Sequence, residues 1–317
     1  MGCTMFSRKE EQIKKEDLIP RKDYDKLNDL VKVHQDYLNN IFVFYKLKPT
    51  PYLQSLRDLS YEFLRLFDNI CKKYDLDYWM AYGSLLGTVR HNDFVPWDDD
   101  LDVGMMRKDY MKLIEVIESE IEANNLENFK CAYKIDKHDK VSKRWFQISY
   151  YLPDYNRKVI GIDIFPHDFI DGEASDDFED RYYDSRAKFY DRRKKSDDMD
   201  KITQQLYDEL NLSMEPQEYF THGVESVHGK VNMFKFQIIE TKELFPLQRA
   251  EFGKIDVPIP NNPPFFLKST YGNKFMRIPK KIRAHGRLAY FHEIEGIIER
   301  FNGLSGDIRK VNDSYGF

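Results

Sequence analysis

The sequence predicts an α+β fold, in which a mixed β-sheet is flanked by helices on at least one face. In the first half of the chain, segments with apolar residues at helical spacing alternate with short runs rich in β-branched and aromatic residues, which are typical of strands. In the second half, a long charged segment nearly free of glycine predicts a helical insertion. With 317 residues and 41% hydrophobic content, the chain is large enough for one sizeable domain with elaborations, or for two small domains.

The first half begins with two amphipathic helices. Apolar residues recur at helical spacing over 23–46 and over 54–74, and Pro49 and Pro51 separate the two segments. The first helix could cap the domain or form a dimer face. The other elements predicted here are strands over 78–81, 99–105, 131–135, 145–152 and 159–165, and helices over 85–90 and 107–124.

The second half is predicted to be mostly helical at first and extended later. Residues 173–228 predict two or three helices that form a lid or a side module. The basic residues from Arg181 to Lys195 are either a solvated helix face or a surface for an anionic substrate. Five prolines make 245–264 extended, and 231–241 is ambiguous. A short helix within 262–275 and a closing helix over 288–301 complete the chain.

These elements divide the chain into four parts. The predicted parts are a polar tail and amphipathic helix (1–50), a core of helices and strands (51–172), a helical insertion or lid (173–241) and a segment that completes the core domain (242–317).

Composition narrows the classes of function. A net charge of −5 and a pI of about 6.0 give no support for a nucleic-acid partner. Three widely spaced cysteines argue against a disulfide framework or a zinc motif, and so indicate a reducing compartment. No apolar run approaches the ~20 residues of a membrane span, and Phe6 departs from the myristoylation pattern. We therefore expect a cytoplasmic protein with at most peripheral contact with a membrane.

A run of acids at 98–102 is the strongest chemical signal. Alternate residues of a strand face the same way, so Asp100 and Asp102 share one face, while Leu101 and Val103 enter the core. Asp98 has the same parity as this pair, and Asp99 is expected to point the other way. Two neighbouring carboxylates repel each other unless a cation lies between them, and Mg²⁺ or Mn²⁺ suits carboxylate oxygens.

Two other interpretations of this run are an exposed acidic loop and a calcium-binding loop. The apolar residues around the acids argue against a solvated loop. A calcium loop of the EF-hand type would need glycine where Val103 stands and glutamate where Asp109 stands.

Three further features belong with the acids. Asp163 interrupts an apolar strand and could supply a third carboxylate, or it could cap a turn at Pro166-His167. Gly83 and Ser84 precede a predicted helix, whose N-terminal amides and hydroxyl group could hold a phosphate. Gly-Ser alone is a weak signal for a phosphate site. It becomes a strong one here, because Ser84 stands sixteen residues before Asp100 on the predicted acidic strand. Arg90 is a candidate phosphate clamp, or else a surface arginine.

Three longer segments resemble the LicD family. They are GSLLGTVRHNDFVPWDDDLDV (83–103), IDIFPHDFIDG (162–172) and PIPNNPPFFLKSTYGN (258–273), and the resemblance covers roughly 56–171 and 245–285. It implies a nucleotidyltransferase-like fold and metal ligands at Asp100, Asp102 and Asp163, with Asp98 as an auxiliary or a base. Asn273 departs from the family pattern, which often has an acid there.

The resemblance also implies a reaction. A phosphorylated alcohol, foremost phosphocholine, would pass from a CDP-activated donor to a sugar hydroxyl of a cell-surface glycan, and CMP would leave. A lipid-linked acceptor would bring the protein to the membrane surface. The alternatives are a polyol-phosphate transferase that uses CDP-ribitol, a nucleotidyltransferase that moves NMP to a small molecule or a nucleic-acid end, and a non-catalytic nucleotide-binding module.

A choline group would need aromatic faces around its quaternary ammonium. The candidates, each of which could instead be a core residue, are Trp79, Trp97, Trp145, Tyr150 and Tyr151.

Overall fold

The structure is a computed structural model that describes residues 20–42, 48–136, 143–172, 175–196, 198–226, 236–279 and 291–317. The chain folds into two compact units. The smaller unit contains residues 1–47 and 276–281, and the larger contains 48–275 and 282–317. The predicted four-part division stays a prediction.

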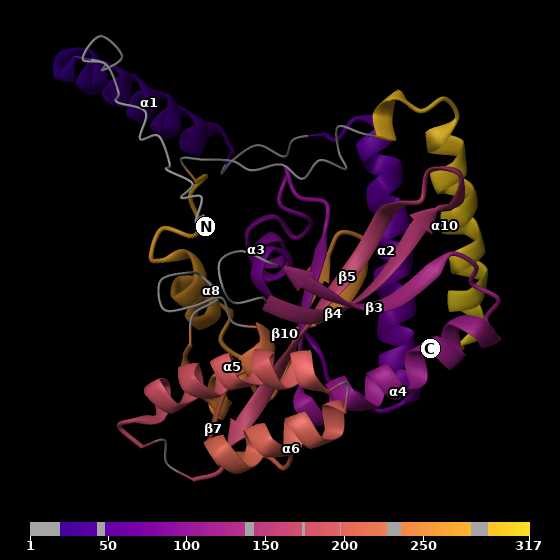
Figure 1. Cartoon of the computed structure of the whole chain (residues 1–317). Helices are drawn as coiled ribbons and strands as arrows, with labels where there is room; N and C mark the ends of the chain where they lie inside the picture. Colours follow the sequence, from indigo (N-terminus) through magenta and orange to yellow (C-terminus); the bar gives the residue numbers. More distant parts are fainter. Residues whose placement is uncertain are drawn as a thin grey trace, which may run out of the picture. The chain divides into compact units, whose positions relative to one another are not determined.

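A mixed β-sheet is the centre of the larger unit (Figure 1). Its strand order is β1-β2-β5-β4-β3, with β2 and β5 parallel and the other neighbours antiparallel. Together with the helices, this sheet confirms the predicted α+β class. The strands are β1 (Trp79–Met80), β2 (Leu101–Met106), β3 (Phe129–Asp136), β4 (Lys143–Leu152) and β5 (Arg157–Ile170).

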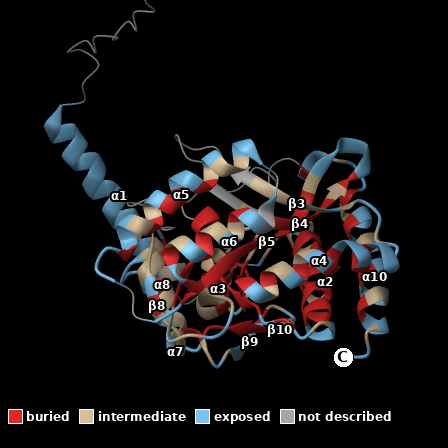
Figure 2. Ribbon diagram, turned by 60° about the horizontal axis from the view of Figure 1, so that its bottom comes forward, coloured by how far each residue is buried: buried red, intermediate tan, exposed pale blue. Residues whose placement is uncertain are grey.

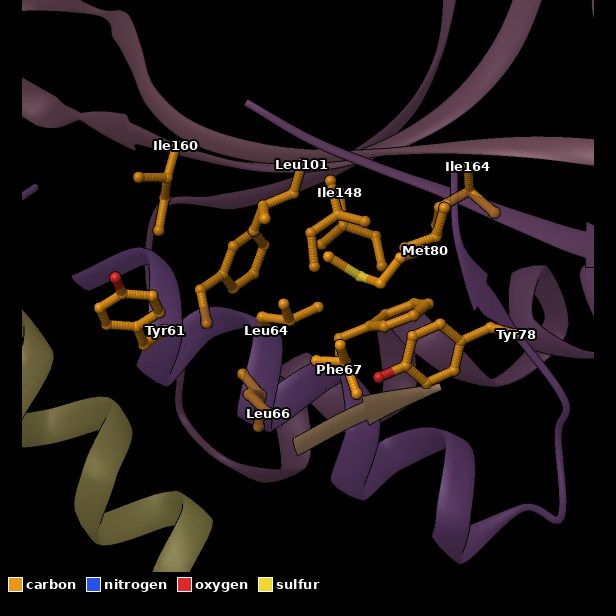
Figure 3. Close-up of a cluster of buried hydrophobic side chains, with 14 of the residues drawn as sticks. Tyr61, Leu64, Leu66, Phe67, Tyr78, Met80, Leu101, Ile148, Ile160 and Ile164 are labelled. Atoms are coloured by element: carbon orange, nitrogen blue, oxygen red, sulfur yellow. The ribbon is translucent and has the colours of Figure 1, made fainter. Parts of the chain in front are cut away.

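One face of this sheet is apolar and packs on α2 (Pro51–Lys73) (Figure 3). Leu101, Ile148 and Ile164 lie on this face, and Leu64 and Phe67 of α2 meet them. Full burial of each such side chain is worth about 1.5–3 kcal/mol, so the face supplies a large part of the stability. Two further helices, α4 (Arg107–Ala123) and α10 (Ile297–Ser314), bury side chains in the same core.

Specific residues explain where α2 begins and how it contacts α10. Thr50 accepts a hydrogen bond from the Leu53 amide and Pro51 opens the first turn, two features that favour helix initiation. Along its length α2 lies beside α10, where the Asn312 side chain donates to the Glu62 carbonyl at 2.9 Å. The predicted helix over 54–74 is therefore confirmed with an earlier start.

The C-terminal half of β5 extends beyond its neighbours into a second group of strands. From His167 to Ile170 it pairs with β7 (Tyr219–His222), and β8 (Ile238–Glu240) pairs with β7 in turn. A turn at Pro166-His167 was therefore the wrong alternative. Pro166 lacks an amide hydrogen, but its carbonyl accepts a hydrogen bond from Gly223 at 2.8 Å, so the strand continues.

The predicted helical insertion is part helix and part strand. Two helices, α5 (Phe178–Lys195) and α6 (Met199–Leu210), enclose a small core with Ile170 of β5. The helical prediction over 173–228 is wrong at β6 (Leu212–Ser213) and β7, because both pair with the extended end of β5. Residues 231–235 of the ambiguous segment lie outside the described part of the chain.

The last third also differs in detail from prediction. The extended segment contains the hairpin of β9 (Gln248–Phe252) and β10 (Ile255–Ile259), followed by α8 (Pro263–Tyr271). The closing helix begins at Ile297, not at 288, and Leu288 lies outside the described residues. Gly296, with φ of +70°, stands at its N-terminus, in a conformation that glycine adopts without strain.

The smaller unit contains α1 (Arg21–Phe42), which confirms the first predicted helix as far as it is described. Its predicted end at 43–46 lies outside the described residues. Asn39 accepts a hydrogen bond from the Ile278 amide at 2.7 Å within this unit. Leu27 and Leu30 are about half exposed, and most of α1 is coloured as exposed in Figure 2. Among the described helices, none combines the length and the apolar character needed to cross a bilayer.

Candidate metal and phosphate site

Three carboxylates, two from adjacent strands and one from the residue directly before one of them, meet on the face of the sheet opposite the core. Asp102 of β2 is in register with Asp163 of β5, and Asp100 directly precedes β2. One oxygen from each of the three lies within 4.8 Å of the others. Leu101 and Val103 are buried on the other side, as strand alternation predicts. Three carboxylate oxygens at this spacing fit a hard divalent cation.

The alternation does not extend to the residues before the strand. Because β2 begins at Leu101, Asp98 and Asp99 lie in the preceding loop. There Asp98, Asp99 and Asp100 form a second group whose oxygens also lie within 4.8 Å of one another. Asp99 therefore does not point away from Asp98 and Asp100, although it is not part of the group formed by Asp100, Asp102 and Asp163.

The first turn of α3 (Tyr82–His91) lies against these acids. A Cβ atom on Gly83 would lie 2.7 Å from Asp98 Oδ2 and 3.7 Å from Asp102 Oδ2, so only glycine lets the carboxylates come this close. The helix begins at Tyr82, so Gly83 and Ser84 belong to its first turn and do not precede it. Backbone amides and the helix dipole favour an anion at this position.

Ser84 holds the backbone of the metal-site strand. Its buried Oγ accepts a hydrogen bond from the Asp102 amide at 2.8 Å. The Asp102 carbonyl in turn accepts from the Ala81 amide at 2.9 Å. The Ser84 hydroxyl proton can still be donated to a ligand. Phosphate binding by Ser84 stays a prediction, but the contact with Asp102 gives this serine a structural role that the sequence did not indicate.

Arg90 lies at the other end of α3 and is half-buried, unlike the surface arginine of the alternative interpretation. Its Nη1 donates to the Phe275 carbonyl at 2.9 Å, and its guanidinium carbon lies 5.7 Å from the centre of the Trp97 ring. Its Nε donates to His91 Nε2 at 2.8 Å. Burial lowers the pKa of His91 to about 4, which keeps this acceptor neutral. Its role as a phosphate clamp stays a prediction.

Two tyrosines lie close to the acids. Tyr271, at the end of α8, has a pKa raised well above its usual value by burial and then by the charges of Asp102 and Asp98. Burial and the charge of Asp102 also raise the pKa of Tyr82. The Tyr82 ring meets Phe165 edge to face at 5.0 Å between centroids. Both phenols therefore stay protonated and can donate hydrogen bonds at the site.

Comparison with known proteins identifies the family to which this site belongs. The sequence profile described as "LicD/FKTN/FKRP, nucleotidyltransferase domain" matches residues 75–204, which include β1, α3, β2 and β5. Residues 75–204 therefore belong to the LicD family. The matched range confirms the resemblance over 75–171 and extends past it into α5 and part of α6, so part of the helical insertion belongs to the LicD-family domain. The third segment, at 258–273, lies outside the matched range, and its resemblance stays a prediction.

Curated relatives of this LicD-family domain share short segments with it. "Lipopolysaccharide cholinephosphotransferase LicD" of Haemophilus influenzae is 42% identical over 53 residues, which are 17% of this chain and 20% of the relative. "Ribitol 5-phosphate transferase FKRP" of Homo sapiens is 53% identical over 32 residues, which are 10% of this chain and 6% of the relative. An uncharacterized protein of Rickettsia typhi is 31% identical over 115 residues, 34% of each chain. The chain thus spans about a third or less of these relatives.

The sequence did not reveal every residue of the LicD-family site. Gln147 of β4 is 2% exposed and donates from Nε2 to Asp163 Oδ1. Its contact depends on strand register, for which a single sequence has no signal. Tyr271 lies in the third motif and Tyr82 directly precedes Gly83, but neither tyrosine carried a sequence signal of its own.

Of the five aromatic residues predicted as candidates for contact with choline, some lie in the hydrophobic core and others lie near the acids. Trp79 and Tyr150 are 2% and 8% exposed and belong to hydrophobic clusters. Tyr151 is half-buried and lies under Lys130 Nζ, 4.2 Å from its ring centre. Trp145 is half-buried and stacks on Phe165 at 5.9 Å, on the strand face that carries Asp163. Only Trp145 and Trp97 therefore remain candidates for contact with a ligand at the acids.

Proposed function

We propose that the chain transfers a phosphorylated alcohol, foremost phosphocholine, from a CDP-alcohol to a sugar hydroxyl of a cell-surface glycan. The observation that carries this proposal is the meeting of Asp100, Asp102 and Asp163 beside the first turn of α3 in a LicD-family domain. A cation site next to a helix N-terminus is what a diphosphate requires. The names of the relatives support transfer of choline phosphate or ribitol phosphate.

The three carboxylates suit Mg²⁺ or Mn²⁺. Such an ion, when bound, neutralises charge on the diphosphate and improves CMP as a leaving group. Asp100, Asp102 and Asp163 would hold it, because each offers an oxygen at the common point. The Gly83 and Ser84 amides and the Ser84 hydroxyl would bind a phosphate oxygen, and Arg90 would bind another.

The reaction needs one proton acceptor. The acceptor hydroxyl oxygen forms a bond to the phosphorus that carries the alcohol, the bond from that phosphorus to the CMP oxygen breaks, and the hydroxyl proton goes to a carboxylate. Asp163 and Asp98 are the candidates. Asp163 is already oriented by the Gln147 amide, as ligating carboxylates are, which leaves Asp98 as the better proton acceptor.

Aromatic side chains around the acids favour choline over a polyol. Tyr82, Trp97, Trp145 and Tyr271 are all half-buried and come from four different segments near the site. A quaternary ammonium is stabilised on such rings, whereas a polyol needs several hydrogen-bonding groups. Ribitol phosphate remains the second candidate because of the FKRP relatives.

The test is a screen of CDP-alcohols with and without Mg²⁺. Metal-dependent release of CMP from CDP-choline in the presence of a glycan acceptor is expected, with phosphocholine mass added to the acceptor. A ribitol-phosphate adduct would select the second candidate. An NMP adduct would instead identify a nucleotidyltransferase that acts on a small molecule or a nucleic-acid end. Binding of CDP-choline without CMP release from any donor would identify a nucleotide-binding module and overturn the proposal.

The partners and the location belong to the same proposal. We propose a cytoplasmic protein, which would meet a lipid-linked glycan at the inner face of the membrane. Sedimentation of the protein with vesicles that carry a lipid-linked acceptor, but not with plain vesicles, would support this peripheral contact.

A further inference from the structure

Gln147 lies in the row of the sheet that carries the acids. Across this row, Asp102 of β2 is in register with Asp163 of β5, and Asp163 is in register with Gln147 of β4. Side chains in register on neighbouring strands project from the same face and touch. Gln147 is therefore the next side chain in line after the two carboxylates.

The amide of Gln147 is engaged at only one end. Its Nε2 donates to Asp163 Oδ1. Its Oε1 is buried and has no hydrogen-bond partner among the residues that the structure describes. An unsatisfied buried acceptor destabilises the fold, a cost that an apolar side chain of similar size would avoid. Packing alone therefore does not explain a glutamine at this position.

We infer that Gln147 is a positioning residue of the divalent-cation site. The inference rests on the proposed function in taking Asp100, Asp102 and Asp163 as the ligands of the cation. A carboxylate that binds a cation must be held against rotation about its Cβ–Cγ bond, and a donor on one oxygen holds it. The Gln147 amide does this for Asp163 through its Nε2.

Mn²⁺ binding to the full chain, without donor or acceptor, tests this inference. Electron paramagnetic resonance of free Mn²⁺ measures the dissociation constant of Gln147→Leu and of Ser149→Ala. Ser149 is a matched control, because it is buried on the same face of the same strand but pairs with Gly161. We expect Gln147→Leu to weaken Mn²⁺ binding about 10–100-fold. Ser149→Ala should stay within about twofold of the wild type.

A purely structural role for Gln147 predicts a different pattern. In that case Gln147→Leu would lower the melting temperature but leave the Mn²⁺ dissociation constant of the folded protein unchanged, and the inference would be overturned. If the leucine variant does not fold, Gln147→Met, which keeps the unbranched shape, takes its place with the same expectation. In turnover, added Mn²⁺ should restore kcat in either variant, because the residue acts through the cation.

The design separates this inference from the proposed function. If Asp102→Asn has the same Mn²⁺ dissociation constant as the wild type, the inference is overturned, because the acids are then not the cation site. If Mn²⁺ binds through the acids and is weakened by Gln147→Leu, but no CDP-alcohol releases CMP, the inference stands and only the proposed function fails.

Discussion

At the scale of single residues, the site depends on close approach between groups that would otherwise repel or collide. Three carboxylates share one point, and a fourth, Asp98, lies against the backbone of Gly83. The pairing of Asp102 with Asp163 follows from parallel register, whereas the loop position of Asp98 does not follow from any periodicity. Strand geometry thus places the carboxylates of Asp102 and Asp163, whereas the loop before β2 places that of Asp98.

Removal of one ligand should separate activity from stability. Asp100→Asn and Asp102→Asn should each lower CMP release by at least ~100-fold, because each removes a cation ligand. Without metal, each variant should be as stable as the wild type or more stable, because a repulsion between carboxylates is lost. Urea denaturation and a CMP-release assay measure the two effects. Turnover near that of the wild type at saturating Mg²⁺ would show that the metal assignment is wrong.

Substitution of Gly83 tests the close approach to Asp98. In Gly83→Ala the new Cβ would lie 2.7 Å from Asp98 Oδ2, so this carboxylate must move. A side-chain end moves at little cost, so we expect a change of less than about 1 kcal/mol in the free energy of unfolding but at least ~10-fold lower activity.

The matched control for Gly83 is Gly303, which lies in α10, where a Cβ atom added to it would meet no other atom within 4 Å. Gly303→Ala should raise stability by about 0.5–1 kcal/mol and leave activity unchanged. Equal activity in the two alanine variants would mean that catalysis does not depend on the close approach of Asp98 to Gly83 of α3.

At the scale of elements, a buried ion cluster connects the sheet to the inserted segment. Arg107 opens α4 and makes two hydrogen bonds to Asp168 of β5, at 2.8 and 2.9 Å. It makes two more to Glu225, at 2.5 and 3.0 Å, and Tyr207 of α6 donates to Asp168 at 2.9 Å. All three charged residues are buried. The cluster therefore fixes the extended end of β5 against the insertion.

Loss of the arginine should destabilise the larger unit strongly. Arg107→Met leaves two buried carboxylates without a positive charge to balance them, so we expect a loss of about 3–5 kcal/mol in the free energy of unfolding, measured in urea. The control is Lys108→Ala, which breaks an exposed ion pair with Glu215 and should cost less than about 1 kcal/mol. Similar losses for both variants would show that the cluster does not anchor the insertion.

The elements also show where sequence patterns were sufficient. The spacing of apolar residues identified α1, α2 and α4 to within a few residues. It failed for β6 and β7, because strands that pair at the far end of β5 carry no strong local pattern in a charged segment. It also misplaced α10, whose two internal glycines at 303 and 306 hide its helical character.

At the scale of the whole molecule, a buried histidine pair makes stability depend on pH. His167 Nε2 and His222 Nδ1 lie 3.0 Å apart, and both rings are buried. Burial lowers the pKa of His167 from 6.5 to about 4, so the folded protein keeps this ring neutral where the unfolded chain protonates it. This contribution to stability is complete above pH 6.5 and is lost as the pH falls toward 4.

A histidine substitution isolates this effect. Between pH 6.5 and 4 the wild type should lose about 2–3 kcal/mol more stability than His167→Gln, as measured by urea denaturation at each pH. The comparison cancels the opposite contribution of Asp109, whose pKa burial raises to about 6 and which both proteins share. Parallel pH curves for the two proteins would contradict a neutral buried His167.

Local sequence was enough to predict the fold class, the family and the acids, because periodicity and short motifs are properties of neighbouring residues. It placed Leu101 and Val103 in the core and Asp100 and Asp102 opposite them, since a strand alternates whatever its partners are. Packing in three dimensions was needed to show that Asp163 faces Asp102, that Gln147 holds Asp163, and that Tyr271 lies near the acids. These contacts depend on strand register and helix packing between residues far apart in the chain, which no local pattern encodes.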